Sequence, residues 1–291
     1  MKTKSIFFKA VLIIAVLFFN WSTFSQTQKS NSEIKTKTVV FITGAFVGSN
    51  CWDEWKPYFE SRGYTVIVPN YPFKDADPAT LRNRKSNSEL AGLTLPQVTD
   101  YYEKIVRKLP EKPILIGHSL GGLITQILVN KNIAAAGIAI HSAPPKGILP
   151  LKSSSIKSIW SALSLFKTSK KTYMMSFKDW QYAFTNEMTE AEQRAAYEKY
   201  ATPESVRLIR GGLTNAAKVD FKKQHDPLLI VSGDKDHFFP PSINYKNYKK
   251  YKKNSNSITD YKEFKGRNHF VLGLPTWREN ADYILNWISS Y

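Results

Sequence analysis

Short apolar segments recur along the chain and predict the strands of a sheet. Five of them are apolar at successive positions, which is typical of parallel strands buried on both faces, and a sixth near the C-terminus is strand-like. The six segments are 39–42, 64–68, 113–117, 134–141, 227–233 and 259–264. We expect them to form a mostly parallel, twisted sheet of about six strands.

Segments with helical spacing separate these strands. Pro96 suits a first helical turn, and apolar residues then recur at helical intervals as far as Leu109. Residues 73–94 are polar and predict a loop with helical turns around 77–84. The other predicted helices of this kind are 52–62, 120–130, 241–252 and 277–288. Strands alternating with helices predict an α/β fold with helices on both faces of the sheet.

The alternation stops at Ser142 and resumes near residue 225. Between these points the pattern is helical, with no clear strand, over residues 156–166, 177–184, 190–200 and 203–213. An all-helical insertion between two strands predicts a lid. We therefore divide the chain into a core, residues 38–145 and 225–291, and a helical lid insertion, residues 146–224.

The first 25 residues have the pattern of a signal peptide. Lysines at positions 2, 4 and 9 precede an apolar run over residues 10–19, and Thr23 and Ser25 place small residues before a cleavage site. An uncleaved membrane anchor is the alternative, although Asn20 interrupts a run that is already short for a span. We expect an exported protein, periplasmic or secreted, in which residues 26–37 form a flexible lead-in.

Composition narrows the picture further. Cys51 is the only cysteine, so the chain cannot form an internal disulfide. The formal net charge is +17, and it would be +14 without the three lysines of residues 1–25. The densest basic run, 245–253, interleaves tyrosines with lysines. Nucleic acid binding is one interpretation; we favour a solvated helix face with the tyrosines turned to the core, and expect no nucleic acid partner.

The strongest chemical signal lies where the third strand ends. Ligands in open parallel sheets bind at the carboxyl ends of the strands, and here the strand runs into Gly117-His-Ser-Leu-Gly121 followed at once by a helix. Such a strained turn exposes its serine, and the close packing of backbone requires small residues at 117 and 121. Ser119 is therefore the candidate nucleophile.

A serine hydroxyl needs a base, and the base needs an orienting carboxylate. His269 lies in a loop after the last strand, where a base can reach Ser119, and it is the candidate base. The fifth strand ends in Gly233-Asp-Lys-Asp236. Asp236 is the candidate acid because it stands further into the loop, whereas Asp234 suits the turn and is the fallback.

The other four histidines fit the role of base less well. His118 lies inside the turn and suits packing, and His141 ends a strand, where it could line the pocket. His225 precedes a strand, and His237 directly follows Asp236. Two backbone N–H groups are expected to hold a developing oxyanion. They are those of Leu120, at the helix start, and Ala45, in the loop after the first strand.

Together these motifs resemble the α/β-hydrolase superfamily over nearly all of residues 38–291. Gly44-Ala-Phe-Val-Gly-Ser-Asn-Cys-Trp52, the Gly117–Gly122 turn and the single lid are similar to the esterase, hydroxynitrile lyase and plant methylesterase branch. The resemblance implies the same triad and the same oxyanion donors. The chain departs from the family at Thr43, where many members carry a histidine, in its lid sequence, and in having room for one leading strand at most.

We expect a serine hydrolase that cleaves a carboxylic ester or a related acyl bond of a small-molecule substrate. Lyase, C–C hydrolase or cofactor-free perhydrolase chemistry by the same triad is the alternative, and a non-catalytic binding protein of this fold is a more remote one. No metal-binding or dinucleotide-binding motif is present in the sequence, so we expect neither a metal nor a redox cofactor.

Overall fold

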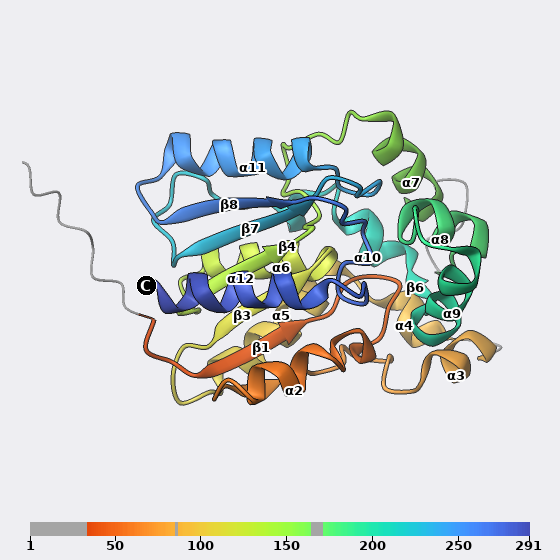
Figure 1. The fold of residues 1–291 in the computed structure, drawn as a ribbon, viewed down its shortest axis with the longest axis horizontal. Coiled ribbons are helices and arrows are strands. Elements are labelled where there is room, and N and C mark those ends of the chain that lie inside the picture. Colours follow the sequence, from red (N-terminus) through yellow and green to blue (C-terminus); the bar gives the residue numbers. More distant parts are fainter. Residues whose placement is uncertain (1–33, 85–86, 164–170) are drawn as a thin grey trace, which may run out of the picture. The chain divides into compact units, whose positions relative to one another are not determined.

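A parallel sheet of six strands organises the described part of the chain (Figure 1). The computed structural model describes residues 34–84, 87–163 and 171–291, so the predicted signal peptide and most of the lead-in lie outside it. The strands are β1 (Thr38–Ile42), β2 (Thr65–Ile67), β3 (Ile114–His118), β4 (Ala136–Ile140), β7 (Leu228–Gly233) and β8 (Thr259–Phe264). Their order is β2-β1-β3-β4-β7-β8, every neighbouring pair is parallel, and the predicted α/β fold is confirmed.

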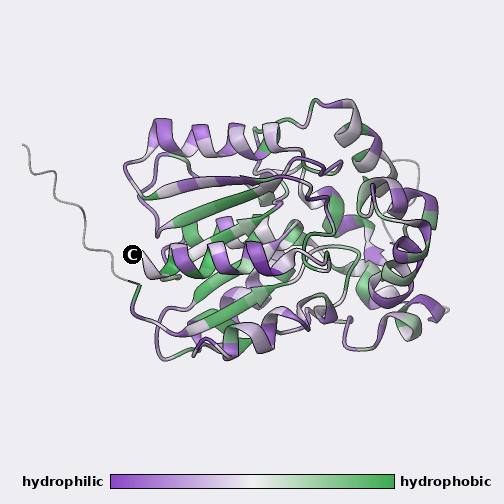
Figure 2. Ribbon diagram, viewed as in Figure 1, coloured by the Kyte–Doolittle hydropathy of each residue, from purple (hydrophilic) through white to green (hydrophobic). Residues whose placement is uncertain are grey.

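Helices cover both faces of this sheet. On one face, α2 (Trp55–Glu60) meets α12 (Trp277–Ser289) through the rings of Trp55 and Trp277, whose centroids are 5.6 Å apart. The opposite face carries α5 (Leu95–Arg107), α6 (Leu120–Asn130) and α11 (Pro241–Asn254). The inner strands between them are mostly hydrophobic, whereas the edge strand β8 and the helix α11 are mostly hydrophilic (Figure 2). The sequence pattern of buried strands follows from this sandwich.

The start of α5 illustrates how local sequence sets an element. The Thr94 hydroxyl accepts a hydrogen bond from the Gln97 N–H, the Gln97 side chain bonds back to Thr94, and Pro96 occupies the first turn. Such a capping box satisfies two N–H groups that the helix leaves without partners. The predicted start of this helix is therefore confirmed.

The segment before α5 is more helical than its composition indicates. It holds α3 (Pro78–Asn83), near the helical turns that the sequence predicts, and α4 (Ser88–Gly92), which the sequence analysis leaves in a loop. Side chains of Asp77 and Asn87 cap the two helices. Upstream, the predicted helix 52–62 is divided into a 3₁₀ turn, η1 (Ser49–Trp52), and α2.

The region predicted as a lid gathers at the end of the sheet where the strands point (Figure 1). It contains α7 (Ser153–Leu163), α8 (Phe177–Ala183), α9 (Glu190–Tyr200), α10 (Val206–Gly211) and η2 (Asn215–Ala217). The expectation that it holds no strand is wrong, because β5 (Thr172–Tyr173) and β6 (Glu204–Ser205) pair in antiparallel fashion. Two residues are too few to leave a periodic pattern, and the predicted helix 203–213 accordingly begins only after β6.

The basic helix α11 also differs in part from its prediction. Tyr251 is buried, but Tyr248 is half-buried and Tyr245 is 45% exposed. Ile243 and Asn247 instead share the buried face with Tyr251. Tyrosines at intervals of three drift around a helix of 3.6 residues per turn, so only one of them reaches the core. Within the described residues, no helix is long and apolar enough to cross a membrane.

Candidate active site

Ser119 lies in a tight turn between β3 and α6. Its backbone has φ 57° and ψ −119°, an unusual conformation for a residue with a side chain. A Cβ at Gly117 would come within 2.1 Å of the Gly121 carbonyl oxygen, and one at Gly121 within 2.1 Å of that of Ile42. Glycine is therefore required at both positions, and the packing around them holds the strained turn in place.

The structure brings the three residues of the predicted triad together. Nε2 of His269 is 3.0 Å from Oγ of Ser119, and its Nδ1 is 2.8 Å from Oδ2 of Asp236. All three side chains are buried, with His269 fully inaccessible and Ser119 5% exposed. This is the arrangement in which an imidazole takes a proton from a hydroxyl while a carboxylate orients the ring.

Two backbone N–H groups and His269 hold the Asp236 carboxylate. Its Oδ1 accepts hydrogen bonds from the amides of Phe238 and Phe239, at 2.7 and 2.9 Å. Burial by itself would raise the pKa of Asp236, but the neighbouring histidines, chiefly His269, outweigh burial and lower it. Asp234 does not join the triad: its Oδ1 accepts from the Gly266 N–H at 2.6 Å and so links the loop after β7 to the loop after β8.

His118 contacts the loop that carries His269. Its Nε2 donates to the backbone carbonyl of His269 at 2.9 Å, and the two rings lie 4.8 Å apart. Burial, reinforced by His269 and His141, holds the pKa of His118 well below its usual range. A neutral ring with its proton on Nε2 thus positions the loop that carries His269.

A cavity of about 350 Å³ opens beside Ser119. The Ala45 and Leu120 residues line it, and neither amide donates to a backbone carbonyl in the turns and loops of the described chain, so both N–H groups remain for an oxyanion. The rest of the lining is almost entirely apolar and includes Phe46, Ile148, Leu149, Ile159, Leu163, Phe184, Ile209, Leu213, Phe238 and Phe239. The cavity suits an apolar group attached to a reactive carbonyl.

A buried charge cluster braces the loop that carries Ala45. Oε2 of Glu204, in β6, accepts from the Phe46 N–H at 3.3 Å and from Nζ of Lys74 at 2.7 Å, and it hydrogen-bonds with the Tyr71 hydroxyl. Lys74 also donates to the carbonyl of Val47 at 3.0 Å. The Glu204 carboxylate, from the insertion predicted as a lid, therefore holds the loop that follows β1 in place.

Lys74 and Glu204 are deeply buried, so each charge needs the other as a partner. Glu204 is inaccessible and Lys74 is 2% exposed. Burial lowers the pKa of Lys74 although Glu204 opposes that change. Breaking one partner of such a pair leaves an uncompensated charge in the interior. The position of Ala45 thus depends on residues far apart in the sequence.

Comparison with known proteins places the chain in a family. The family model described as the alpha/beta hydrolase family matches residues 39–278. The chain belongs to this family. It is also similar to Methylesterase 3 of Arabidopsis thaliana, with 30% identity over 95 residues, 32% of this chain and 34% of the methylesterase. The match therefore spans about a third of that curated relative.

Solved structures show that the α/β-hydrolase fold extends over most of the chain. A monoacylglycerol lipase of Paleococcus ferrophilus superposes with a TM-score of 0.63 at 18% identity, over 87% of this chain and 94% of the lipase. A variant of polyneuridine aldehyde esterase superposes with a TM-score of 0.60 at 17% identity, over 87% of this chain and 99% of the esterase. At these identities the likeness concerns the fold.

In this α/β hydrolase, the expectation that His141 lines the pocket is wrong. His141 is inaccessible and is absent from the described residues around the cavity. Its backbone has φ 46°, which turns the chain after β4, and its Nδ1 lies 2.9 Å from Oδ2 of Asp236. The two atoms are close but not aligned as a regular hydrogen bond. His141 therefore faces the acid from the far side, and burial lowers its pKa despite that carboxylate.

The remaining histidines lie apart from the triad. Nδ1 of His225 contacts the carbonyl of Asp226, and Nδ1 of His237 contacts that of Tyr182. His141, Asp236 and His269 are close enough to each other for a metal ion. Oδ2 of Asp236 is hydrogen-bonded to Nδ1 of His269 at 2.8 Å, and Oδ1 is held by two backbone amides. The trio fits a proton relay better than a metal centre.

Sequence reasoning misses the brace formed by Tyr71, Lys74 and Glu204. Tyr71 follows β2, Lys74 lies in the segment predicted as a polar loop, and Glu204 lies in a stretch predicted to be helical. The one available signal is Thr43, where the family often has a histidine, because that departure leaves the support of the first loop to other residues. Which residues supply it depends on contacts that a linear pattern does not contain.

Proposed function

We propose that this α/β hydrolase cleaves carboxylic esters through an acyl-enzyme on Ser119. The observation that carries the proposal is the continuous contact from the Ser119 hydroxyl through His269 to Asp236 beside an apolar cavity. The esterases and lipases among its structural relatives agree with this class of reaction.

The geometry supports a two-step reaction. Oγ of Ser119 attacks the acyl carbon while Nε2 of His269 takes the hydroxyl proton, and the amides of Ala45 and Leu120 stabilise the oxyanion. Collapse of this intermediate breaks the C–O bond, and His269 returns the proton to the leaving alcohol. Water, activated by the same nitrogen, then releases the acid and restores the Ser119 hydroxyl.

The apolar lining favours esters with a hydrophobic acyl or alcohol part. Burying an apolar chain in such a cavity gains about 0.8 kcal/mol for each CH₂ group. We therefore expect p-nitrophenyl esters of increasing acyl length to bind with falling KM until the chain fills the cavity. The cavity offers few polar groups that would recognise a charged acyl group.

Replacement of the nucleophile tests the proposal. In Ser119→Ala, kcat for p-nitrophenyl butyrate should fall by at least about a thousandfold, because no acyl-enzyme can form. A fluorophosphonate probe should label the wild-type chain on the peptide that contains Ser119 and leave the variant unlabelled. Ser142→Ala, two residues beyond the end of β4, is the control, because the Ser142 hydroxyl bonds to Gln126 and to the Ala143 carbonyl and not to the triad; it should keep its activity and labelling.

Two results would contradict the proposal. One is full activity in Ser119→Ala with the correct fold retained. The other is a purified wild-type chain that reacts with neither the probe nor any ester of the acyl-length series.

A further inference from the structure

Large apolar side chains are exposed around the mouth of the cavity. In the described part of the chain, six large hydrophobic residues are strongly exposed, and five belong to segments that border this opening. We call these five the mouth patch: Leu149 (64% exposed), Leu151 (68%), Ile156 (51%), Trp160 (54%) and Leu213 (58%). Single exposed apolar residues are ordinary, but a contiguous group of them marks a binding surface.

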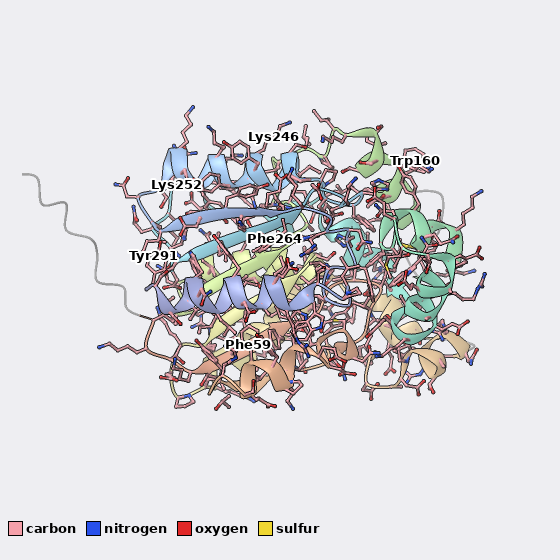
Figure 3. The ribbon with its side chains drawn as sticks, in the orientation of Figure 1. Phe59, Trp160, Lys246, Lys252, Phe264 and Tyr291 are labelled. Carbon is pink, nitrogen blue, oxygen red and sulfur yellow. The ribbon has the colours of Figure 1, made fainter. Side chains whose placement is uncertain are left out.

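The mouth patch continues the lining of the cavity. Leu149 and Leu213 contribute to both, since they line the cavity and are more than half exposed. On α7, Ile159 and Leu163 face the cavity. Ile156 and Trp160 lie beside Ile159 and Leu163 on this helix, since residues three and four positions apart share a face. Trp160 projects from α7 at the end of the molecule that carries the lid helices (Figure 3).

The segment that carries most of the mouth patch is basic. No aspartate or glutamate occurs between Glu111 and Asp179, whereas residues 146–178 contain seven lysines. The five of these lysines that the structure describes are all exposed: Lys146, Lys152, Lys157, Lys171 and Lys178. Apolar side chains flanked by lysines are the combination that binds anionic lipid headgroups together with the upper part of the acyl chains.

We propose that the mouth patch docks on an anionic lipid bilayer and that the cavity receives the apolar chain of an ester from that surface. The docking stands by itself, whereas the choice of substrate rests on the proposed ester hydrolysis. A second copy of this chain is the less suitable occupant, because it would bring two basic segments of the same kind together. Lys146 donates to Asn215 and Lys157 lies over the Tyr182 ring, but neither contact supplies a negative charge, so an uncharged surface would leave the positive charge of the segment unmatched.

Vesicle binding tests the docking without any need for catalysis. The Ser119→Ala chain, as full-length protein and from Gln26 onward, is mixed with vesicles of phosphatidylcholine alone or in equal parts with phosphatidylglycerol, and the bound fraction is measured by flotation. We expect binding to the anionic vesicles, weaker binding to the neutral ones, and release at high salt. Adding Leu151→Ser and Trp160→Ser should lower the partition coefficient by roughly tenfold.

Charge variants separate the electrostatic part of the binding. Lys152→Gln and Lys157→Gln should each weaken binding to anionic vesicles by roughly fivefold and change binding to neutral vesicles little. Lys252→Gln on α11 is the matched control, because Lys252 lies toward the opposite end of the molecule from Trp160 (Figure 3). Tyr245→Ser controls for apolar area, because Tyr245 is the one strongly exposed large hydrophobic residue outside the mouth patch among the residues that the structure describes.

Several outcomes would overturn the docking. They are wild-type binding no stronger than that of Leu151→Ser/Trp160→Ser, equal losses in the α11 controls, or concentration-dependent dimers that the mouth patch variants lose. The last result would make a second copy the occupant.

An activity measurement tests the substrate class separately. With Ser119 in place, Leu151→Ser/Trp160→Ser should slow hydrolysis of a long-chain p-nitrophenyl ester held in anionic vesicles by roughly tenfold. It should leave p-nitrophenyl acetate turnover in solution unchanged, which also shows that the variant is folded. Equal rates on the vesicle substrate would overturn delivery from the surface. A wild-type chain inert toward both esters would overturn the proposed function and leave the vesicle result standing.

Discussion

The two sides of the active site are held in different ways. On the acid–base side, Ser119, Asp236 and His269 follow β3, β7 and β8, so the sheet itself brings them together. On the oxyanion side, the loop with Ala45 follows β1, but its position also depends on Glu204 from the lid. The insertion also contacts the acid–base side, because the Phe184 carbonyl accepts from the Phe270 N–H at 3.0 Å and the Asn186 carbonyl accepts from Asn268 at 2.8 Å. The two sides differ in that strand ends bring the triad together, whereas a buried carboxylate of the insertion supports the loop with Ala45.

This difference indicates how residues of the insertion can affect the proposed reaction. The insertion predicted as a lid reaches the site directly, because Glu204 bonds to Phe46, the residue next to the expected oxyanion donor. The backbone carbonyl of Phe46 also accepts from the Thr202 N–H at 2.8 Å. Loss of the contacts from Glu204 and Thr202 would therefore act first on the loop with Ala45 and not on the hydrogen bonds of the triad. Damage to the two sides should accordingly have different kinetic signatures.

The largest effect is expected on the acid–base side. Asp236→Asn should lower kcat by about a thousandfold to ten-thousandfold, because the neutral amide no longer stabilises the imidazolium or sets the tautomer of His269. The measurement is kcat and KM for p-nitrophenyl butyrate. Asp234→Asn is the control, since Asp234 bonds to Gly266 and not to the triad, and it should stay within about threefold of wild type. Equal losses in both variants would refute this assignment of the acid.

A smaller and different effect is expected on the oxyanion side. Glu204→Gln should lower kcat by roughly tenfold to a hundredfold with little change in KM, because misplacing one donor weakens only the transition state. Affinity for a trifluoromethyl ketone, which forms an oxyanion with Ser119, should fall in parallel. The variant should also lose about 3 kcal/mol of unfolding free energy, because Lys74 keeps a buried charge without a partner.

A double variant separates the brace from a general loss of stability. Lys74→Met/Glu204→Gln contains no unpaired buried charge and should recover much of the unfolding free energy. Its kcat should stay low, since the Phe46 amide still lacks the carboxylate. Recovery of kcat together with stability would mean that the cluster stabilises the fold without positioning the oxyanion donor.

The smallest effect is expected on the free energy of unfolding at acid pH, which depends on two buried histidines near Asp236. His118 and His141 both have lowered pKa values in the folded chain. At pH values below their usual pKa of about 6.5, both histidines bind protons in the unfolded chain but stay neutral in the folded chain. The free energy of unfolding therefore falls as the pH drops, by about 1.4 kcal/mol per pH unit for each histidine. Denaturant unfolding at a series of pH values measures this slope.

A single substitution sharpens this test. His141→Asn should reduce the slope between pH 6.5 and 5.5 by about the share of one histidine, whatever its effect on stability at neutral pH. His237→Asn, whose ring contacts the Tyr182 carbonyl, is the comparison variant. An unchanged slope in His141→Asn would show that His141 does not stay neutral beside Asp236.

The site residues that adjoin strand ends could be predicted from the sequence, whereas the residues that support the loop with Ala45 could not. The turn with Ser119, the two loops with Asp236 and His269, and the amides of Ala45 and Leu120 each adjoin a strand end, so a local pattern was enough to place them near one another. His141 also ends a strand, yet its direction was mistaken, because the turn at φ 46° aims its ring at Asp236 and away from the cavity. Backbone direction at one residue is not encoded in a hydrophobic pattern.

The sequence by itself determined the α/β sheet, the order of its strand ends and the residue types at those ends. Apolar runs and glycine spacing act over a few residues, and the parallel sheet converts them into a shared edge. Only the tertiary structure decided the buried pair of Lys74 and Glu204, the small β5–β6 ladder and the mouth patch around the cavity. These features arise between segments more than a hundred positions apart or within the insertion, where packing, rather than local preference, selects the partners.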